Sequence, residues 1–495
     1  MKKYVLAIDQ GTTSSRAILF NKKGEPVRIA RRDIKTSFPK PGWVEESATD
    51  IWVSVVESIT ELVEKAHIHY NEIDSIGITN QRETTVVWDK ESGAPVYPAI
   101  VWQSRQTASL CDKRNSKSDF IFSRTGLRLN PYFSASKIRF ILDHIPNGQK
   151  RAEKGELLFG TVETWLIYKL TNGRNHLTDV TNASRTMLFN IKTRKWDKDL
   201  LKIWNIPSCM LPKICPTAHD FGDATYLKHD IPITGVAGDQ QAALFGQTCF
   251  AKGESKNTYG TGCFMLMNIG DKPILSKHGL LTTVAWEIDG KVTYALEASV
   301  FMGGATIQWL RDGLEIIKST PESETLAKKV KDTDGVYLVP AFVGLGTPYW
   351  DNDVRAAFFG LTRGTTKEHI ARASLEAVAY QISDSLRVMQ NETKIKLKAL
   401  NVDGGASANN FLMQFQSDIL GCAVKLPVCV ETTALGAAYM AGLQTGFFKS
   451  LNEISKYHRY QKIYQPKMNK NLVSEKLHGW DLAVKSARSF KPHLK

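Results

Sequence analysis

The chain has 495 residues, of which 42% are hydrophobic and 23% charged, and its 64 Lys and Arg against 50 Asp and Glu give a formal net charge of +14. This composition is typical of a globular protein and excludes a disordered or fibrous chain. At roughly 150 residues per domain, the length predicts two to four domains.

A β-hairpin is predicted at the start of the chain. Apolar runs at residues 4–8 and 16–20 flank the polar, turn-rich segment 9–15, which is typical of two strands and a loop. Apolar residues then recur at three- and four-residue spacing from Ser47 to Ala66, so an amphipathic helix is expected there.

Strand and helix patterns alternate along the rest of the chain. Strands are predicted at residues 75–79, 85–88, 231–236, 335–340 and 399–402. Helices are predicted at residues 366–389, 410–420 and 433–443, the last of them ending at Gly446. This alternation predicts an α/β fold whose sheets are covered on both faces.

Two segments of the chain look like copies of one hairpin. Residues 11–13, Gly-Thr-Thr, are echoed by residues 257–262, Asn-Thr-Tyr-Gly-Thr-Gly, which also lie between strand-like runs. The echo predicts two related domains, 1–248 and 249–495, with a boundary within residues 246–256. Two glycines and three charged residues break the apolar pattern in that boundary segment: Gly246, Lys252, Gly253, Glu254 and Lys256.

Charge, cysteine content and the N-terminal sequence bear on partners and compartment. The net charge permits nucleic acid, a membrane surface or anionic small molecules as partners. The seven cysteines include no Cys-x-x-Cys pair, so neither a disulfide framework nor a zinc site is predicted. The first apolar run is shorter than the roughly seven to fifteen residues of a signal peptide, and no run reaches the roughly 18 to 20 of a membrane span. We expect a cytoplasmic protein without membrane insertion.

Two glycine-containing motifs suit a nucleotide. Asp9 precedes the turn at residues 11–14, where backbone N–H groups and hydroxyls would cradle phosphate while the carboxylate holds hydrated Mg²⁺. Gly404 and Gly405 follow a predicted strand, where a nucleoside could approach the backbone closely. A plain polar turn and close helix–sheet packing are the respective alternatives. The sequence lacks the Gly-x-x-x-x-Gly-Lys-Ser/Thr motif, which disfavours a P-loop.

Polar residues at two further strand ends suit a polyol substrate. Asp239 follows an apolar strand and suits a general base, with a helix N-cap as the alternative. Arg82 and Glu83 could grip vicinal hydroxyls, with a surface ion pair as the alternative. Three aromatic residues could wall a small carbon skeleton, or each could be a core residue: Trp102, Tyr132 and Phe264.

Five long motifs then point to a known family. They are IDQGTTSSR (8–16), GITNQRETT (77–85), TNASRTMLF (181–189), AGDQQAALFG (237–246) and TYGTGCF (258–264). On these motifs the chain, from Tyr4 to about Ala487, resembles the FGGY carbohydrate kinases, which share the ATPase fold of actin, hexokinase and Hsp70. The resemblance implies two actin-like (ribonuclease H-like) α/β domains flanking a catalytic cleft.

The resemblance also implies an activity. It is ATP-dependent phosphorylation of glycerol to sn-glycerol 3-phosphate (EC 2.7.1.30) in glycerol uptake and catabolism, with Mg²⁺ as cofactor and a homodimer or homotetramer as the assembly. One alternative is another polyol or pentulose kinase of the same family. The other is a non-catalytic, ATP-dependent clamp on the same fold, which has no use for a carboxylate aligned with an Arg-Glu pair.

Motif positions carry the family's site residues onto this chain. Glycerol would contact Arg82, Glu83, Trp102, Tyr132, Asp239, Gln240 and Phe264. ATP would contact Thr12, Thr13, Ser14, Arg16, Thr261, Gly304, Gln308, Gly405 and Asn409. The metal residues would be Asp9, which would bind Mg²⁺ through water, and Asp239, which would also be the catalytic base.

The sequence departs from relatives where those are regulated. Residues 222–231 lack the Gly-rich loop and Arg that bind fructose 1,6-bisphosphate, and they lack the pattern around a His phosphorylated by the phosphotransferase system. Neither form of regulation is therefore expected, and His229 is interpreted as an exposed loop residue. Leu472 stands about where a zinc-bridging Glu docks a regulator in relatives.

Much of the net charge lies at the C-terminus. Residues 449–495 hold eleven basic and three acidic residues, which we interpret as the exposed face of C-terminal helices with a mild attraction for anions such as ATP. No motif for nucleic acid accompanies the charge, so no such partner is expected.

Overall fold

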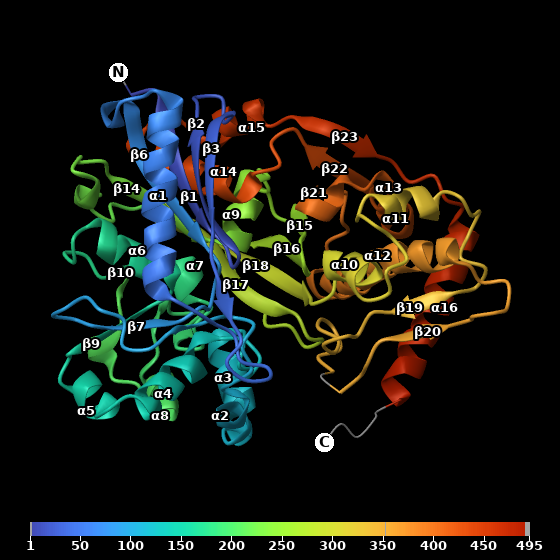
Figure 1. The fold of residues 1–495 in the computed structure, drawn as a ribbon, viewed down its shortest axis with the longest axis horizontal. Coiled ribbons are helices and arrows are strands. Elements are labelled where there is room, and N and C mark those ends of the chain that lie inside the picture. Colours follow the sequence, from blue (N-terminus) through green and yellow to red (C-terminus); the bar gives the residue numbers. More distant parts are fainter. Residues whose placement is uncertain (1, 352, 491–495) are drawn as a thin grey trace.

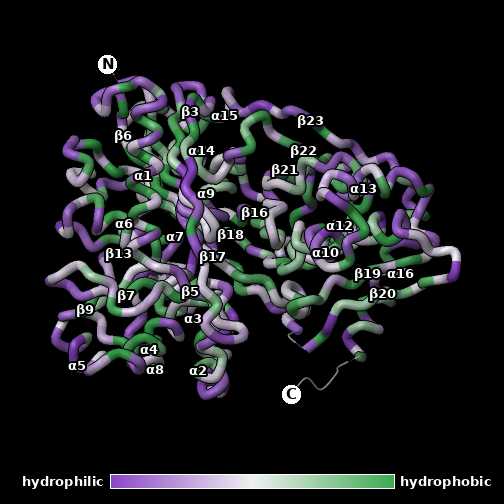
Figure 2. Tube along the Cα trace, in the orientation of Figure 1, coloured by the Kyte–Doolittle hydropathy of each residue, from purple (hydrophilic) through white to green (hydrophobic). Residues whose placement is uncertain are grey.

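A computed structural model describes residues 2–351 and 353–490 as two lobes, each built around one β-sheet (Figure 1). We call the part built on the five-stranded sheet the first lobe and the part built on the seven-stranded sheet the second lobe. Buried hydrophobic residues form the interior of both lobes, and many hydrophilic segments lie at the outer rim of the trace (Figure 2).

The sheet of the first lobe has the strand order β14-β6-β1-β2-β3. Its strands are β1 (Tyr4–Gln10), β2 (Ser14–Phe20), β3 (Pro26–Asp33), β6 (Ile73–Asn80) and β14 (Ile233–Gly238). The predicted hairpin is confirmed, because β1 and β2 pair antiparallel with Asp9 opposite Arg16. Strands β6 and β14 continue the sheet parallel to β1.

The sheet of the second lobe has the order β17-β18-β16-β15-β21-β22-β23. Its strands are β15 (Ser255–Tyr259), β16 (Cys263–Gly270), β17 (Leu281–Ile288), β18 (Lys291–Val300), β21 (Ala399–Asp403), β22 (Ala423–Pro427) and β23 (Tyr460–Tyr464). The run β18-β16-β15-β21-β22 repeats the order and strand directions of β3-β2-β1-β6-β14. The echo between the two hairpins therefore reflects two copies of one sheet topology.

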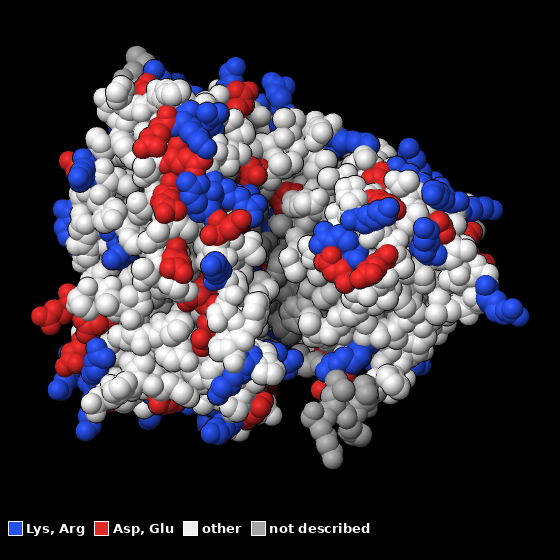
Figure 3. Space-filling view, viewed as in Figure 1, with Lys and Arg blue, Asp and Glu red and all other residues white. Residues whose placement is uncertain are grey.

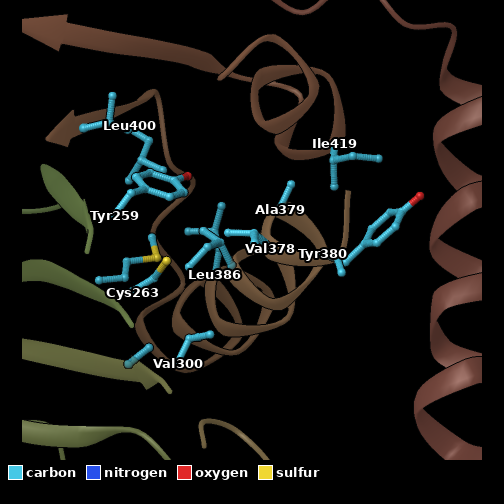
Figure 4. Close-up of a cluster of buried hydrophobic side chains, with 14 of the residues drawn as sticks. Tyr259, Cys263, Val300, Val378, Ala379, Tyr380, Leu386, Leu400 and Ile419 are labelled. Carbon is cyan, nitrogen blue, oxygen red and sulfur yellow. The ribbon is translucent and has the colours of Figure 1, made fainter. Parts of the chain in front are cut away.

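Three long helices flank the sheets as their patterns predict. Helix α1 (Ala48–Ala66) packs on β2 and β3, starts at Ser47, whose hydroxyl accepts the Asp50 N–H, and ends at His67 in the left-handed region. Helices α12 (Lys367–Thr393) and α13 (Asn410–Leu420) pack against each other in the second lobe. Figure 4 shows side chains of α12, among them Val378 and Leu386, beside Tyr259, Cys263 and Val300 of the strands.

Helix α14 (Thr432–Thr445) comes from the second half of the chain but packs on β1, β6 and β14 of the first lobe. Glycines permit this close approach: a Cβ on Gly77 would lie 2.3 Å from the carbonyl oxygen of Ala437. A Cβ on Gly436 would lie 1.8 Å from the carbonyl oxygen of Ala242 in helix α9 (Asp239–Gly246). Helix α9 in turn contacts β15, β16 and β17 of the second sheet, so the close contact between α9 and α14 links the two lobes.

The remaining elements are short or peripheral. The helices are α2 (Ala108–Asp112), α3 (Ser118–Thr125), α4 (Ser134–His144), α5 (Gly148–Glu153), α6 (Val162–Leu170), α7 (Val180–Ala183), α8 (Lys198–Trp204), α10 (Gly304–Asp312), α11 (Glu322–Ala327), α15 (Leu451–Tyr457) and α16 (Lys470–Ser489). The strands are β4 (Thr36–Ser37), β5 (Glu45–Glu46), β7 (Val86–Asp89), β8 (Ala99–Ile100), β9 (Leu157–Gly160), β10 (Leu177–Asp179), β11 (Phe189–Asn190), β12 (Lys195–Trp196), β13 (Lys213–Cys215), β19 (Tyr337–Val339) and β20 (Ala357–Phe359).

The residues predicted to be exposed differ in their surroundings. His229 is exposed, as predicted, and stacks on Tyr70. Most described basic residues of the C-terminal segment are exposed, but Lys476 of α16 is buried and pairs with Glu376 of α12, because its ammonium compensates a buried carboxylate. Lys491 and Lys495 lie outside the described residues. Across the described part of the chain, no helix is both long and apolar enough to cross a membrane.

Candidate active site

The candidate site forms where three parallel strands end side by side. Gln10 of β1, Asn80 of β6 and Gly238 of β14 are in register at the carboxyl end of the first sheet. The loops that follow therefore place the phosphate-type turn, the Arg-Glu pair and the predicted base at one edge, which is where open α/β sheets bind ligands. Figure 3 shows a hollow between the two lobes on this face.

Arg82 and Glu83 belong to a buried network of four charges that spans both lobes. The Arg82 guanidinium bonds both carboxylate oxygens of Glu297 on β18, at 2.6 and 3.0 Å. Arg185 donates to Glu83 at 2.6 Å and to Glu297 at 2.9 Å. The four side chains are at most 2% exposed, so the surface ion pair considered for Arg82 and Glu83 is wrong.

The carboxylates in this network are electrostatically distinct. Burial opposes ionisation of Glu297, but Arg185 and Arg82 outweigh burial and hold its pKa well below the usual range. For Glu83 burial dominates over the attraction of the same two guanidiniums, so its pKa is raised. Glu83 also has a positive φ of 61°, which turns the chain sharply after the strand end.

Asp239 is the most accessible carboxylate at this edge, with 31% of its side chain exposed. One oxygen accepts the Gln240 backbone N–H at 2.7 Å and lies 3.2 Å from Arg82 Nε, and the other accepts Gln240 Nε2 at 3.2 Å. Helix α9 begins at Asp239 itself and its N-cap is Gly238. The N-cap alternative for Asp239 is therefore wrong, and its partly exposed carboxylate is held by Arg82 and Gln240.

Gln240 is also held from the second lobe. Lys256 of β15 donates from Nζ to Gln240 Oε1 and, at 2.8 Å, to Thr258 Oγ1. Lys256 is fully buried and lies in strand β15, at the end of the segment predicted to hold the domain boundary. A strand that faces the other lobe, and not a flexible linker, accounts for this lysine.

Three aromatic side chains meet beside this carboxylate edge. The ring of Trp102 lies 5.7 Å from that of Tyr132 and 6.1 Å from that of Phe264, both edge-on. All three are half-buried, and Tyr132 also packs against the core of the first lobe. The Trp102 indole N–H donates to Thr12 Oγ1 at 2.9 Å. The aromatic wall is thereby tied to the tip of the first hairpin.

Asp9 lies beneath that hairpin tip. It is 4% exposed, and Arg16 lies 3.2 Å away and also bonds Glu431 at 2.6 Å. Burial raises the pKa of Asp9 to about 6; Arg16 opposes this shift, while Glu431 and Asp239 add to it. Because the charge of Asp239 acts on Asp9, the two carboxylates share one electrostatic environment.

This carboxylate pair fits hydrated Mg²⁺ bound together with a nucleotide. Mg²⁺ beside phosphates is held by one or two carboxylates, water and phosphate oxygens, not by a closed protein cage. Asp9 and the half-exposed Asp239 supply such a pair. Within residues 2–351 and 353–490, no group of three or more His, Cys, Asp or Glu is arranged to hold a metal by itself.

The nucleotide-type residues of the second lobe converge on the other hairpin. Gly304 begins α10 and donates its N–H to Gly260 in the tip between β15 and β16. A Cβ on Gly404 would lie 2.6 Å from Tyr259 O, whereas one on Gly405 would meet no described atom within 4 Å. Close packing therefore explains Gly404, and open space for a ligand remains at Gly405.

The other predicted nucleotide residues differ in exposure and in their contacts. Thr13 and Thr261 are exposed at the two hairpin tips, and Ser14 is buried at the start of β2. Gln308 is exposed on α10. Asn409 is fixed by its role as N-cap of α13, where it accepts the Leu412 N–H at 2.9 Å.

Four charged residues of this region were not among the predicted site residues. They are Arg185, Lys256, Glu297 and Glu431. Two local signals could have pointed to this network: the carboxylate of Glu297 lies in an otherwise apolar strand, and Arg185 lies within a long motif. Each suggests a buried charge, and a buried charge requires a partner. Their partners lie far away in the sequence, so the network itself had no local signature.

Comparison with known proteins identifies the family of the chain. The model of the FGGY family of carbohydrate kinases matches in two parts, its N-terminal domain over residues 4–246 and its C-terminal domain over residues 255–445. The chain belongs to this family. The FGGY sequence is 57% identical over 99% of its length to the whole of a glycerol kinase of Geobacillus sp. (strain WCH70). It is 56% identical, with the same coverage, to a glycerol kinase of Thermus thermophilus.

Solved FGGY-type structures have the same fold. The crystal structure of Plasmodium falciparum glycerol kinase with ADP superposes with a TM-score of 0.90 at 36% identity, covering 98% of each chain. A xylulose kinase from Lactobacillus acidophilus superposes with a TM-score of 0.87 at 23% identity and 98% coverage of each chain, which shows the fold alone. The expected architecture of two actin-like lobes flanking a cleft is thus confirmed.

Proposed function

We propose that this FGGY kinase phosphorylates glycerol at a terminal hydroxyl with ATP and yields sn-glycerol 3-phosphate. The observation that carries the proposal is identity of 56–57% along essentially the whole chain to several glycerol kinases. The recess beside Asp239 supports it, because one buried Arg-Glu pair and an aromatic wall suit a three-carbon polyol.

In the proposed reaction Asp239 accepts the proton of the terminal hydroxyl as that oxygen attacks the γ-phosphorus of ATP, and the bond from this phosphorus to the β,γ-bridging oxygen breaks to release ADP. Arg82, Glu83, Tyr132 and Gln240 would hydrogen-bond glycerol, and Trp102 and Phe264 would contact its carbons. The support is positional: Asp239 is oriented by Arg82 and Gln240 and remains partly exposed to the cleft. Orientation of the two reactants is the main contribution that phosphoryl transfer needs from the protein.

The phosphates would lie between the two hairpins. Thr12, Thr13, Ser14 and Arg16 would contact them from the first lobe, and the proposed contacts of the second lobe are Thr261, Gly304, Gln308, Gly405 and Asn409. Asp9 and Asp239 would hold Mg²⁺ through water, and bound Mg²⁺ would neutralise charge on the phosphates. Approach of the lobes around glycerol would exclude water and so suppress hydrolysis of ATP.

The competing proposal is a pentulose or another polyol as substrate. A panel of glycerol, dihydroxyacetone, xylulose and ribulose, assayed by ADP release and by detection of the phosphorylated product, separates the two. We expect the highest kcat/KM with glycerol. Preference for a pentulose would overturn the choice of substrate, and tight ATP binding without any phosphorylated product would favour the non-catalytic clamp.

Assembly and regulation complete the proposal. We propose a cytoplasmic homodimer or homotetramer that does not respond to fructose 1,6-bisphosphate, since residues 222–231 lack the binding loop. Repeating the panel with that sugar phosphate tests the second point, and inhibition would overturn it. Sedimentation velocity tests the first, and a monomer at assay concentration would contradict it.

A further inference from the structure

A buried lysine occupies the boundary between the lobes beside the proposed base. Lys256 lies on β15 of the second lobe and is completely buried. Its ammonium makes two hydrogen bonds, both to neutral oxygens: Gln240 Oε1 in the first lobe and Thr258 Oγ1 on its own strand. An unpaired buried cation costs folding free energy, so this lysine is not explained by stability.

The bond to Gln240 fixes which way the carboxamide of that residue faces. An ammonium only donates hydrogen bonds, so it binds the oxygen end of the amide and leaves the NH₂ end free to donate. That NH₂ group donates to Asp239 Oδ2 at 3.2 Å, while Asp239 Oδ1 is held by the Gln240 backbone and Arg82. Without the lysine, the amide could turn its oxygen toward the carboxylate or rotate away.

Charges around the lysine support the same arrangement. Burial lowers the pKa of Lys256 to about 8; Asp403, Asp239 and Glu297 counter this shift, while Arg82 adds to it. These groups face Lys256 from β21, α9, β18 and the turn after β6. Lys256 therefore remains protonated at neutral pH and loses its charge in mildly alkaline solution.

We propose that Lys256 is a positioning residue, which acts from the second lobe through Gln240 to hold the Asp239 carboxylate in the orientation that accepts the hydroxyl proton. Through this chain of contacts a residue of the second sheet fixes the alignment of the proposed base. The inference rests on the proposed phosphorylation of glycerol.

The test compares Lys256→Met with the wild type and with Lys252→Met, an exposed lysine just before the same strand. We expect kcat with glycerol to fall about ten- to hundredfold in Lys256→Met. This loss is part of the roughly 10²- to 10⁴-fold rate acceleration that a positioned general base contributes. KM for ATP should stay close to the wild-type value. The midpoint of thermal unfolding should be equal to or higher than that of the wild type, because no paired charge is lost. Lys252→Met should match the wild type.

Two further measurements separate positioning from a structural role. In the wild type kcat should decline above about pH 8, the pKa of Lys256, and this alkaline limb should be absent in Lys256→Met. In a Gln240→Leu background, Lys256→Met should lower kcat by less than about twofold, since residues that act through one another are not additive. Lys256→Gln, which keeps an N–H donor, should recover part of kcat and keeps the test valid if Lys256→Met does not fold.

A Lys256→Met kcat within twofold of the wild type overturns the inference. So does a loss of kcat that is matched by equal losses of thermal stability and ATP affinity, or one that is fully additive with Gln240→Leu. A wild type that makes no glycerol phosphate refutes the proposed function instead, and the same variants then test Lys256 on the best substrate of the panel.

Discussion

The indole N–H of Trp102 donates to the hydroxyl of Thr12 at 2.9 Å, and this bond joins the proposed glycerol wall to the proposed phosphate turn. The backbone N–H of Trp102 is itself fixed by Thr84 Oγ1 at 3.1 Å. The two substrates of a phosphoryl transfer must be held in line. A direct bond between their binding elements sets the spacing between them.

Trp102→Phe should therefore weaken the reaction although it preserves an aromatic wall. One neutral hydrogen bond is worth about 1 kcal/mol, so we expect kcat/KM for both substrates to fall about fivefold. Thr12→Val should give a similar loss, and the double variant should lose little more than either single one. Trp196→Phe is the control, because its indole bonds the Pro212 carbonyl away from the cleft. Additive losses in the double variant would contradict a role for this bond.

Glu297→Gln should be severely destabilising because it leaves two buried guanidiniums without their shared carboxylate. Arg82 and Arg185 both bond Glu297, and all three side chains are at most 2% exposed. Breaking a buried charge network of this kind lowers the free energy of unfolding by about 3–5 kcal/mol. Urea unfolding of the variant and the wild type measures this loss. Glu287→Gln on the neighbouring strand is the control, since its partner Arg194 is 36% exposed, and it should cost about 1 kcal/mol or less. Equal losses in the two variants would refute the distinction.

The sequence predicted those parts of the fold that rest on local signals. Helix α1 has its apolar stripe, its Ser47 cap and its end within one segment, and α13 begins and ends where its pattern does. The two hairpins have similar tips of small and polar residues, so the repeated sheet topology was indicated in the sequence. The placement of α14 on the first sheet has no such trace, because it depends on contact between Gly77 or Gly436 and residues far away in the sequence.

The same limit applies to the candidate site. Residues in long motifs, such as Asp239 and Arg82, were singled out, and the structure brings them to one strand edge. Lys256 stands out in the sequence only as one of the charged residues that break the apolar pattern near the predicted domain boundary. Its bond to Gln240 is visible only in the structure. The role of a side chain whose partner lies across the lobe boundary therefore cannot be predicted from its neighbours in the sequence.

Asp9→Asn should stabilise the protein at neutral pH while it abolishes turnover. Burial raises the pKa of Asp9 from 3.8 to about 6, so the folded protein holds this proton more tightly than the unfolded chain does. The stability that Asp9 contributes is present below about pH 4 and lost as pH rises through 6. At pH 7.5 the ionised carboxylate costs up to about 3 kcal/mol, which Asn removes.

Urea unfolding of wild type and Asp9→Asn, without nucleotide, at pH 4.5 and pH 7.5 measures this effect. The variant should gain stability relative to the wild type at pH 7.5 and much less at pH 4.5. An Asn variant that is less stable than the wild type at pH 7.5 would show that the pairing of Asp9 with Arg16 outweighs its burial.

Gly404→Ala and Gly405→Ala should have opposite consequences although the two residues are adjacent. Gly404 has φ of +85°, and a Cβ there would lie 2.6 Å from the Tyr259 carbonyl oxygen, so alanine should cost about 1–3 kcal/mol of folding free energy. Gly405 is exposed and its Cβ would meet no described atom within 4 Å. Alanine at Gly405 should leave the unfolding midpoint unchanged but place a methyl group where ATP is proposed to bind. We expect KM for ATP to rise about fivefold or more, with KM for glycerol little changed. Wild-type ATP kinetics in Gly405→Ala would remove this residue from the nucleotide site.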